Sequence, residues 1–255
     1  MRLKASIAAV AALVVALGTA SAASAVGTAP SNAASPLSTP ADFHGPQVWT
    51  GYVDVGHAVT FKSVTADLKV PPVGCTSLNS KASFWIGLDG YGSPTVEQVG
   101  ISTDCFNGTP QVRAWYEMYP KGTVYQFPVL AGDSIAMAVT YDGGSEYSLA
   151  LKDLTRPASK FSKAIDCPSG QSCENLTAEA VLEADNGRNL STFGTNGFTE
   201  FQAVTNTGVR TGLDATSSWG LAKLLMTGAN GKPLATLSAI TNNHENFSLS
   251  YQQPR

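Results

Sequence analysis

Hydrophobic and polar residues alternate over short segments along most of the chain, which is the pattern of β-strands with one buried face. These segments are rich in β-branched and aromatic residues, and Gly, Pro, Asn and Asp separate them. The expected strands are residues 48–55, 61–70, 82–90, 111–120, 133–142, 147–155, 198–204 and 246–253. Turn signals such as YDGGSE and GANGKP fall between them. The pattern therefore predicts an all-β sandwich of antiparallel strands.

The segment TAEAVLEAD, residues 177–185, carries an unusual set of acids. As a strand it has one apolar face of Ala and Leu and an opposite face with Glu179, Glu183 and Asp185. Only 14% of all residues are charged, so three acids on one face suggest a shared purpose. The segment is also compatible with a helix, in which Glu179 and Glu183 would share a face. Residues 217–226, SSWGLAKLLM, have a similar helical periodicity.

Three other segments place a polar side chain beside aromatic ones on a single strand face. They are FWIGLDG with Trp85 and Asp89, VEQVG with Gln98, and AWYEMYP with Trp115 and Glu117. Large rings with a few carboxyl and amide groups can line a groove that binds a polar polymer. The alternative is the ordinary solvated face of an antiparallel sheet, with both tryptophans in the core.

Common catalytic signatures are absent from the sequence. It has no Gly-x-Ser-x-Gly elbow, no His-Glu-x-x-His zinc motif and no Asp-Thr/Ser-Gly motif of aspartic proteases. The three histidines, His44, His57 and His244, are isolated from one another. We therefore expect no metal site, and any chemistry should depend on carboxyl and amide groups.

The N-terminal residues predict export. Arg2 and Lys4 precede an apolar run and then small residues up to Ala25, so residues 1–25 are read as a signal peptide. The apolar run is shorter than the ~20 residues of a membrane span. Residues 26–46 are rich in Ala, Ser, Thr and Pro and are expected to form a flexible lead or a short pro-segment. Residues 47–255 should form one domain of a secreted, extracellular protein.

The charge and the cysteine content give further indications of the class of protein. The net charge is −3 and no basic patch indicates nucleic-acid binding. In an exported chain, four cysteines predict two disulfides, for which three pairings are possible. We favour Cys75 with Cys105 and Cys167 with Cys173, because the second pair closes the short loop CPSGQSC.

In order and spacing, these segments resemble the glutamic peptidases, the eqolisin family of secreted acid proteases. The matching strings, which span nearly all of the expected domain, are VWTGY, FWIGLDG, EQVG, AWYEMYP, AGDSIAMAVT, LKDLT and AEAVLEAD. The resemblance implies a two-sheet antiparallel β-sandwich, a concanavalin-like jelly roll with a concave active-site groove. It places the catalytic dyad on Glu183 and Gln98. It places four further residues in the substrate-binding groove: Trp49, Trp85, Asp89 and Glu117.

The residue types fit peptide hydrolysis by an activated water molecule. An ionised Glu183 can take a proton from water, the Gln98 NH2 group can donate to the oxyanion, and Glu183 can then protonate the leaving nitrogen. With a carboxyl pKa near ~4.3, we expect an endopeptidase most active in acid. We expect polypeptide substrates, no cofactor, no membrane partner and a monomeric enzyme.

Two departures from the family pattern bear on specificity. Arg113 precedes AWYEMYP where better-known fungal members have an acid, and VGISTDC follows Gln98 without an acid soon after the Gly.

Two other functions are compatible with the residues. A carbohydrate-cleaving sandwich would need two carboxyls about 5 to 5.5 Å apart, for example Glu117 and Glu183. A carbohydrate-binding or other binding module would use the aromatic groove without catalysis.

Overall fold

The computed structural model describes residues 48–184 and 189–252. The expected signal peptide (1–25), the expected lead (26–46) and Asp185 lie outside the described residues. Within them the chain forms strands and no helix. The strands are β1 (Trp49–Gly56), β2 (Phe61–Lys69), β3 (Ser83–Asp89), β4 (Val96–Phe106), β5 (Thr109–Tyr119), β6 (Val124–Pro128), β7 (Ser134–Gly143), β8 (Glu146–Asp153), β9 (Lys160–Asp166), β10 (Thr177–Glu183), β11 (Thr195–Thr205), β12 (Arg210–Thr211), β13 (Trp219–Leu224), β14 (Ala235–Leu237) and β15 (Phe247–Tyr251).

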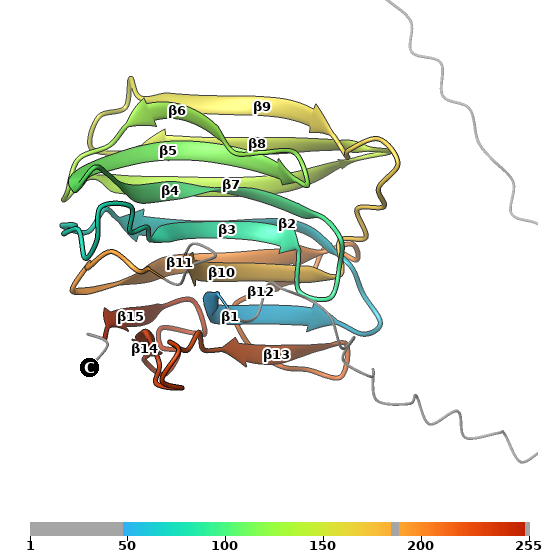
Figure 1. Ribbon diagram of the computed structural model, residues 1–255. Coiled ribbons are helices and arrows are strands. Elements are labelled where there is room, and N and C mark those ends of the chain that lie inside the picture. Colours follow the sequence, from blue (N-terminus) through green and yellow to red (C-terminus); the bar gives the residue numbers. More distant parts are fainter. Residues whose placement is uncertain (1–47, 185–188, 253–255) are drawn as a thin grey trace, which may run out of the picture. The chain divides into compact units, whose positions relative to one another are not determined.

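The strands form two antiparallel sheets, which Figure 1 shows as two stacked layers. The seven-stranded sheet has the order β13-β1-β10-β3-β4-β5-β6. The eight-stranded sheet has the order β14-β15-β11-β2-β7-β8-β9, and β12 pairs with β11. The predicted antiparallel β-sandwich is confirmed. The helical alternative is wrong for both segments, because residues 177–183 and 219–224 pair as β10 and β13 with β1 between them.

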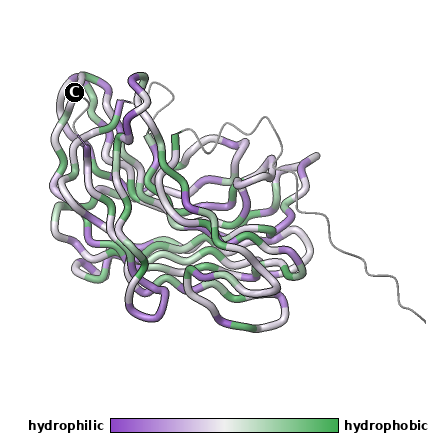
Figure 2. The backbone as a smooth tube through the Cα atoms, turned by 90° about the horizontal axis from the view of Figure 1, so that it is seen from below, coloured by the Kyte–Doolittle hydropathy of each residue, from purple (hydrophilic) through white to green (hydrophobic). Residues whose placement is uncertain are grey.

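Because side chains alternate along the strands, each face of the seven-stranded sheet carries its own apolar cluster. Phe84, Ile86 and Leu88 of β3 point into the main core between the sheets, with Ala180 and Leu182 of β10. Figure 2 shows hydrophobic stretches along the packed strands and hydrophilic stretches mainly in the projecting loops. Ser83, Trp85 and Gly87 of β3 lie on the opposite face, here called the outer face.

The second apolar cluster covers this outer face. It contains Trp49, Val53, Trp85, Trp115 and Val181, with Val96 and Leu224 beside them. Three tryptophans on the outer face of a sheet leave little of that face to solvent. The outer face is therefore not the ordinary solvated side of an antiparallel sheet.

Strand pairing sets the outer-face residues in rows that run across β1, β10, β3, β4 and β5. The first row is Trp49, Glu183, Ser83, Ser102 and Arg113; the second is Gly51, Val181, Trp85, Gly100 and Trp115; the third is Val53, Glu179, Gly87, Gln98 and Glu117. Residues that are far apart in the sequence thus become neighbours. Trp85 lies in the second row, between the row that contains Glu183 and the row that contains Gln98.

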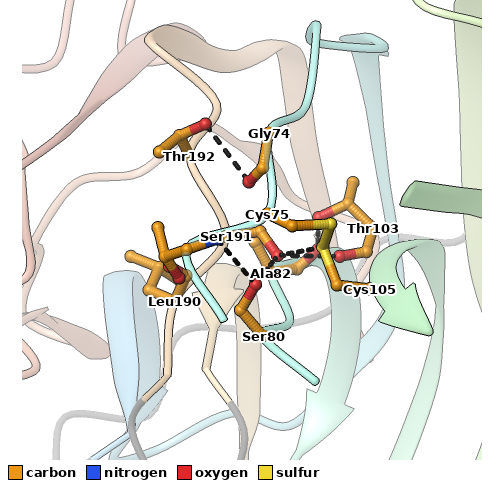
Figure 3. The surroundings of a disulfide bond; sticks show 10 residues. Gly74, Cys75, Ser80, Ala82, Thr103, Cys105, Leu190, Ser191 and Thr192 are labelled. Carbon is orange, nitrogen blue, oxygen red and sulfur yellow. Dashed lines mark hydrogen bonds between the residues drawn. A yellow bond between two sulfur atoms is a disulfide. The ribbon is translucent and has the colours of Figure 1, made fainter. Parts of the chain in front are cut away.

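Two disulfides are present, and they are the favoured pairs. Cys75 and Cys105 have a Cα–Cα distance of 5.7 Å, and Cys167 and Cys173 one of 6.1 Å. Figure 3 shows the first of these between the segment before β3 and the end of β4. In the described part of the chain, no group of His, Cys, Asp and Glu is arranged to hold a metal ion. No helix of the described residues is long and apolar enough to cross a membrane.

Candidate active site

A polar pocket of about 310 Å³ opens on the outer face of the seven-stranded sheet. Its lining comes from β3, β4, β5, β6 and β10 and from segments next to them. The lining residues are Lys81, Ser83, Gln98, Ser102, Asp104, Trp115, Glu117, Thr123, Tyr125, Glu183 and Ala184. Glu183 and Gln98, which the sequence resemblance pairs, are both among them.

The Glu183 carboxyl is held by the indole of Trp85. Trp85 Nε1 donates a hydrogen bond of 3.0 Å to Glu183 Oε2. The side chain of Trp85 is fully buried, and Trp49 packs edge-on against it with ring centroids 4.9 Å apart. Burial raises the pKa of Glu183 to about 7; the N–H groups of Trp49 and Trp85 act in the opposite direction, and the charge of Glu117 adds to the rise.

Two glycines make room for the Trp85 side chain. A Cβ atom on Gly87 would lie 3.1 Å from Trp85 Cζ3, and one on Gly100 would lie 2.6 Å from Trp85 Cβ. The Trp85 residue is therefore packed against the bare backbone of Gly87 in β3 and of Gly100 in β4. This packing puts the indole N–H of Trp85 within reach of the Glu183 carboxyl in the adjacent row.

Gln98 lies in β4 at the floor of the pocket and is only 6% exposed. Its Oε1 is shielded from solvent and has no hydrogen-bond partner. The NH2 group is thus the end of the amide that remains for a ligand in the pocket. An amide donor in a largely buried setting is suited to bind a developing negative charge.

Glu117, paired with Gln98 in the third row, forms the adjoining wall. Its Oε2 accepts a hydrogen bond of 2.6 Å from Thr123 Oγ1, which lies just before β6. Burial raises the pKa of Glu117, and the Thr123 hydroxyl offsets part of the rise. When Glu117 is ionised, its negative charge disfavours the ionised form of Glu183 and so raises the pKa of Glu183.

Glu179 shares the outer face with Glu183, but its surroundings differ. Its side chain is fully buried and does not line the pocket, and neither of its carboxyl oxygens accepts a hydrogen bond. Burial raises its pKa well above the ordinary value. Glu179 is thus buried away from the pocket, whereas Glu183 reaches it.

Asp89 and Trp49 lie around the site and do not line the pocket. Asp89 has a positive φ of 65° at the end of β3 and is fully buried. Its carboxylate accepts hydrogen bonds from the backbone N–H groups of Asn175 (2.7 Å) and Leu176 (2.8 Å), immediately before β10. Asp89 therefore anchors the start of the strand that carries Glu183. Trp49 lies opposite Glu183 in β1 and packs on Trp85.

The sequence model of the Peptidase A4 family matches residues 47–251. The chain belongs to this family, the eqolisins. It is accordingly a glutamic peptidase by family, a hydrolase that acts on peptide bonds. The comparison with curated proteins gives no match.

Solved eqolisin structures have the same fold. Scytalido-glutamic peptidase with a peptide-based transition state analogue matches with a TM-score of 0.65 and 24% identity over 81% of this chain and 98% of that chain. SCP-B in complex with the tripeptide Ala-Ile-His matches with 0.63 and 23% over 81% and 98%. Aspergilloglutamic peptidase from Aspergillus niger matches with 0.55 and 24% over 68% and 99%.

Several residues of this eqolisin pocket were not singled out from the sequence. They are Lys81, Ser83, Ser102, Asp104, Thr123, Tyr125 and Ala184. Strand alternation offered a signal for some of them, because Ser102 and Asp104 share the outer face of β4 with Gln98. No sequence signal pointed to Thr123 and Tyr125, since the edge strand β6 meets β5 through an irregular register.

Proposed function

We propose that this eqolisin is a secreted endopeptidase whose catalytic dyad is Glu183 and Gln98. The observation that supports it best is the presence of both side chains in one pocket, with the Glu183 carboxyl held by Trp85. The pocket also offers the polar lining that a polypeptide backbone needs. Secretion is supported by residues 1–25 and by the two disulfides. The proposed enzyme acts as a monomer and without a cofactor.

In the proposed mechanism, water attacks the peptide carbonyl carbon while the ionised Glu183 accepts a proton from it. The carbonyl oxygen becomes an oxyanion, and the Gln98 NH2 group donates a hydrogen bond to it. Glu183, now protonated, gives the proton to the leaving nitrogen as the C–N bond breaks. The hydrogen bond from Trp85 keeps the carboxyl in one orientation during both transfers.

The burial of Glu183 revises the expected pH dependence. With the ordinary pKa of a glutamate, ~4.3, a carboxylate base would be ionised throughout mild acid. With a pKa of about 7, the ionised fraction of Glu183 instead grows about tenfold per pH unit up to neutrality. On this ground alone, the activity of the proposed enzyme should rise from strong acid toward neutral pH.

Substitution of the dyad tests the proposal. The secreted protein is incubated with a denatured protein substrate between about pH 3 and 7, and cleavage is followed by peptide release. We expect Glu183→Gln to abolish cleavage, and Gln98→Ala to lower the rate by on the order of 10² to 10³. Glu146→Gln, in an exposed position of β8, should cleave like the wild type. Near-normal proteolysis by folded Glu183→Gln protein would refute the dyad.

A parallel incubation with soluble polysaccharides tests the carbohydrate alternative. Glu117 and Glu183 line one pocket, and the charge of Glu117 acts on Glu183, so a pair of carboxyls is present. The buried amide of Gln98 has no role in a two-carboxyl glycosidase scheme. Glycan cleavage that is lost in Glu183→Gln, without proteolysis by the wild type, would replace the peptidase proposal.

A further inference from the structure

Lys81 lies at the end of the pocket beyond the first row of outer-face residues. The pairing of β3 with β4 continues before β3 begins, because the N–H groups of Thr103 and Cys105 donate to the carbonyls of Ala82 (3.0 Å) and Ser80 (2.8 Å). Figure 3 shows these two segments side by side next to the Cys75–Cys105 disulfide. The same register places Lys81 directly opposite Asp104 on the outer face.

The Asp104 carboxylate accepts hydrogen bonds from three side chains, one each on β4, β5 and β6. Its Oδ1 accepts from Ser102 Oγ, and its Oδ2 accepts from Arg113 Nη2 (3.2 Å) and from Tyr125 Oη (2.7 Å). The Arg113 guanidinium lies over the Tyr125 ring, 3.6 Å from its centroid. The Asp104 side chain is 9% exposed. This network leaves Asp104 little capacity to bind a further cation.

The carboxylate that lies opposite Lys81, that of Asp104, therefore already binds Arg113 and Tyr125. Within residues 48–184 and 189–252, no carboxylate forms an ion pair with Lys81. Its side chain is exposed and lines the pocket. Among the described residues at this end of the pocket, the two cations Lys81 and Arg113 face the single carboxylate of Asp104.

We propose that this end of the pocket is a subsite for an acidic side chain of the substrate and that Lys81 determines this preference. The proposal rests on the proposed peptidase function. Lys81 precedes Trp85 by four residues in the extended direction of β3, or ~13 Å at ~3.3 Å per residue. An extended substrate would therefore place the acidic side chain up to about four residues from the bond that is cleaved. Asp and Glu side chains fit, and Lys and Arg side chains are repelled.

The test compares peptides that differ at one position. A fluorogenic peptide cleaved by the wild type is remade with Glu, Gln or Lys at each position up to four residues on either side of the cleaved bond. At about pH 5.5, where a substrate Glu is ionised, we expect one position to favour Glu over Gln by about five- to tenfold in kcat/KM. At about pH 3.5, where that Glu is protonated, the preference should disappear.

Variants of Lys81 test whether this residue causes the preference for Glu over Gln in the peptide. In Lys81→Gln the ratio of Glu to Gln peptides should fall to about one, and Lys81→Glu should favour the Lys peptide instead. Lys232→Gln, an exposed lysine in a turn outside the pocket, should keep the wild-type ratio. An unchanged ratio in Lys81→Gln, or no position that favours Glu in the wild type, overturns this proposal alone. If the wild type cleaves no peptide, the proposed function itself fails.

Discussion

Trp85 holds the Glu183 carboxyl through the hydrogen bond from its indole N–H. Strand alternation alone puts Glu179 and Glu183 on the same face and gives no reason to prefer one of them. The structure separates them by burial: Glu179 is covered, whereas Glu183 lines the pocket and accepts a hydrogen bond from Trp85. A donor to an ionised carboxylate favours the ionised form. Trp85 thus supports the base role of Glu183 against the effect of burial.

Trp85→Phe should make Glu183 harder to ionise. The change removes the indole N–H at 3.0 Å from Glu183 Oε2 but keeps an aromatic ring in the site. A hydrogen bond to a charged group is worth ~1.5 kcal/mol or more, which corresponds to ~1 pH unit. We expect the rising acid limb of the kcat/KM profile to move up by about one pH unit, as measured with a single peptide between about pH 3 and 8.

The matched control for this change is Trp219→Phe. Trp219 is also a buried indole, and its Nε1 donates a 2.9 Å hydrogen bond to a carboxylate, that of Asp214, away from the pocket. Its loss should lower stability and leave the pH profile in place. If both variants shift the acid limb equally, the effect is a general loss of stability and not a property of the Glu183 site.

At the scale of strands, the outer face depends on glycines that allow β3 and β4 to support a tryptophan. Gly100→Ala would bring a Cβ to 2.4 Å from the Phe84 carbonyl oxygen and 2.6 Å from Trp85 Cβ. Both contacts are too close for the side chain to fit without a shift of β3. We expect a loss of roughly 1–3 kcal/mol in the free energy of unfolding, measured in urea, together with reduced peptide cleavage.

Gly122→Ala provides the comparison within the same sheet. A Cβ at Gly122, between β5 and β6, would meet no atom within 4 Å. Its free energy of unfolding and its activity should remain close to those of the wild type. Equal stability of the two variants would show that the packing of β3 on β4 tolerates an added methyl group.

Most strands could be predicted from the sequence, and their partners could not. The expected strands at 61–70 and 147–155 end within two residues of β2 (Phe61–Lys69) and β8 (Glu146–Asp153), because alternation is a local property. The neighbours of each strand depend on long-range pairing, for example β10 between β1 and β3. Of the residues that the resemblance named, Gln98, Glu117 and Glu183 line the pocket, whereas Asp89 has a positive φ and does not. Alternation assumes an extended backbone and cannot anticipate such a residue.

At the scale of the whole molecule, we expect buried acids to set an upper limit on the working pH through the stability of the fold. The carboxyl oxygens of Asp54, Glu97 and Glu179 are shielded and accept no hydrogen bonds. Burial raises the pKa of all three, that of Asp54 to about 9, and the charge of Asp214 adds to this rise. The fold thus favours acid, while Glu183 as a base favours neutrality. Together they predict an activity maximum in mild acid.

The stability of the fold should fall as the pH rises from 4 to 7. A carboxyl such as Asp54 has an ordinary pKa of 3.8 when unfolded and a raised one when folded, so the folded state keeps its proton after the unfolded state has lost it. The stabilisation is complete below about pH 4 and is lost progressively as the pH approaches the folded pKa. Each such carboxyl contributes up to ~1.4 kcal/mol per pH unit.

Thermal unfolding between about pH 4 and 7 measures this loss, with the variant Asp54→Asn beside the wild type. The amide cannot ionise, so the variant should lose less in Tm over this range than the wild type, whatever its stability at pH 4. Asp142→Asn, at an exposed position of β7, should follow the wild-type slope. A wild-type Tm that is constant or rises toward pH 7 would mean that Asp54, Glu97 and Glu179 are ionised in the folded state. The upper limit on the working pH would then have to come from the site itself.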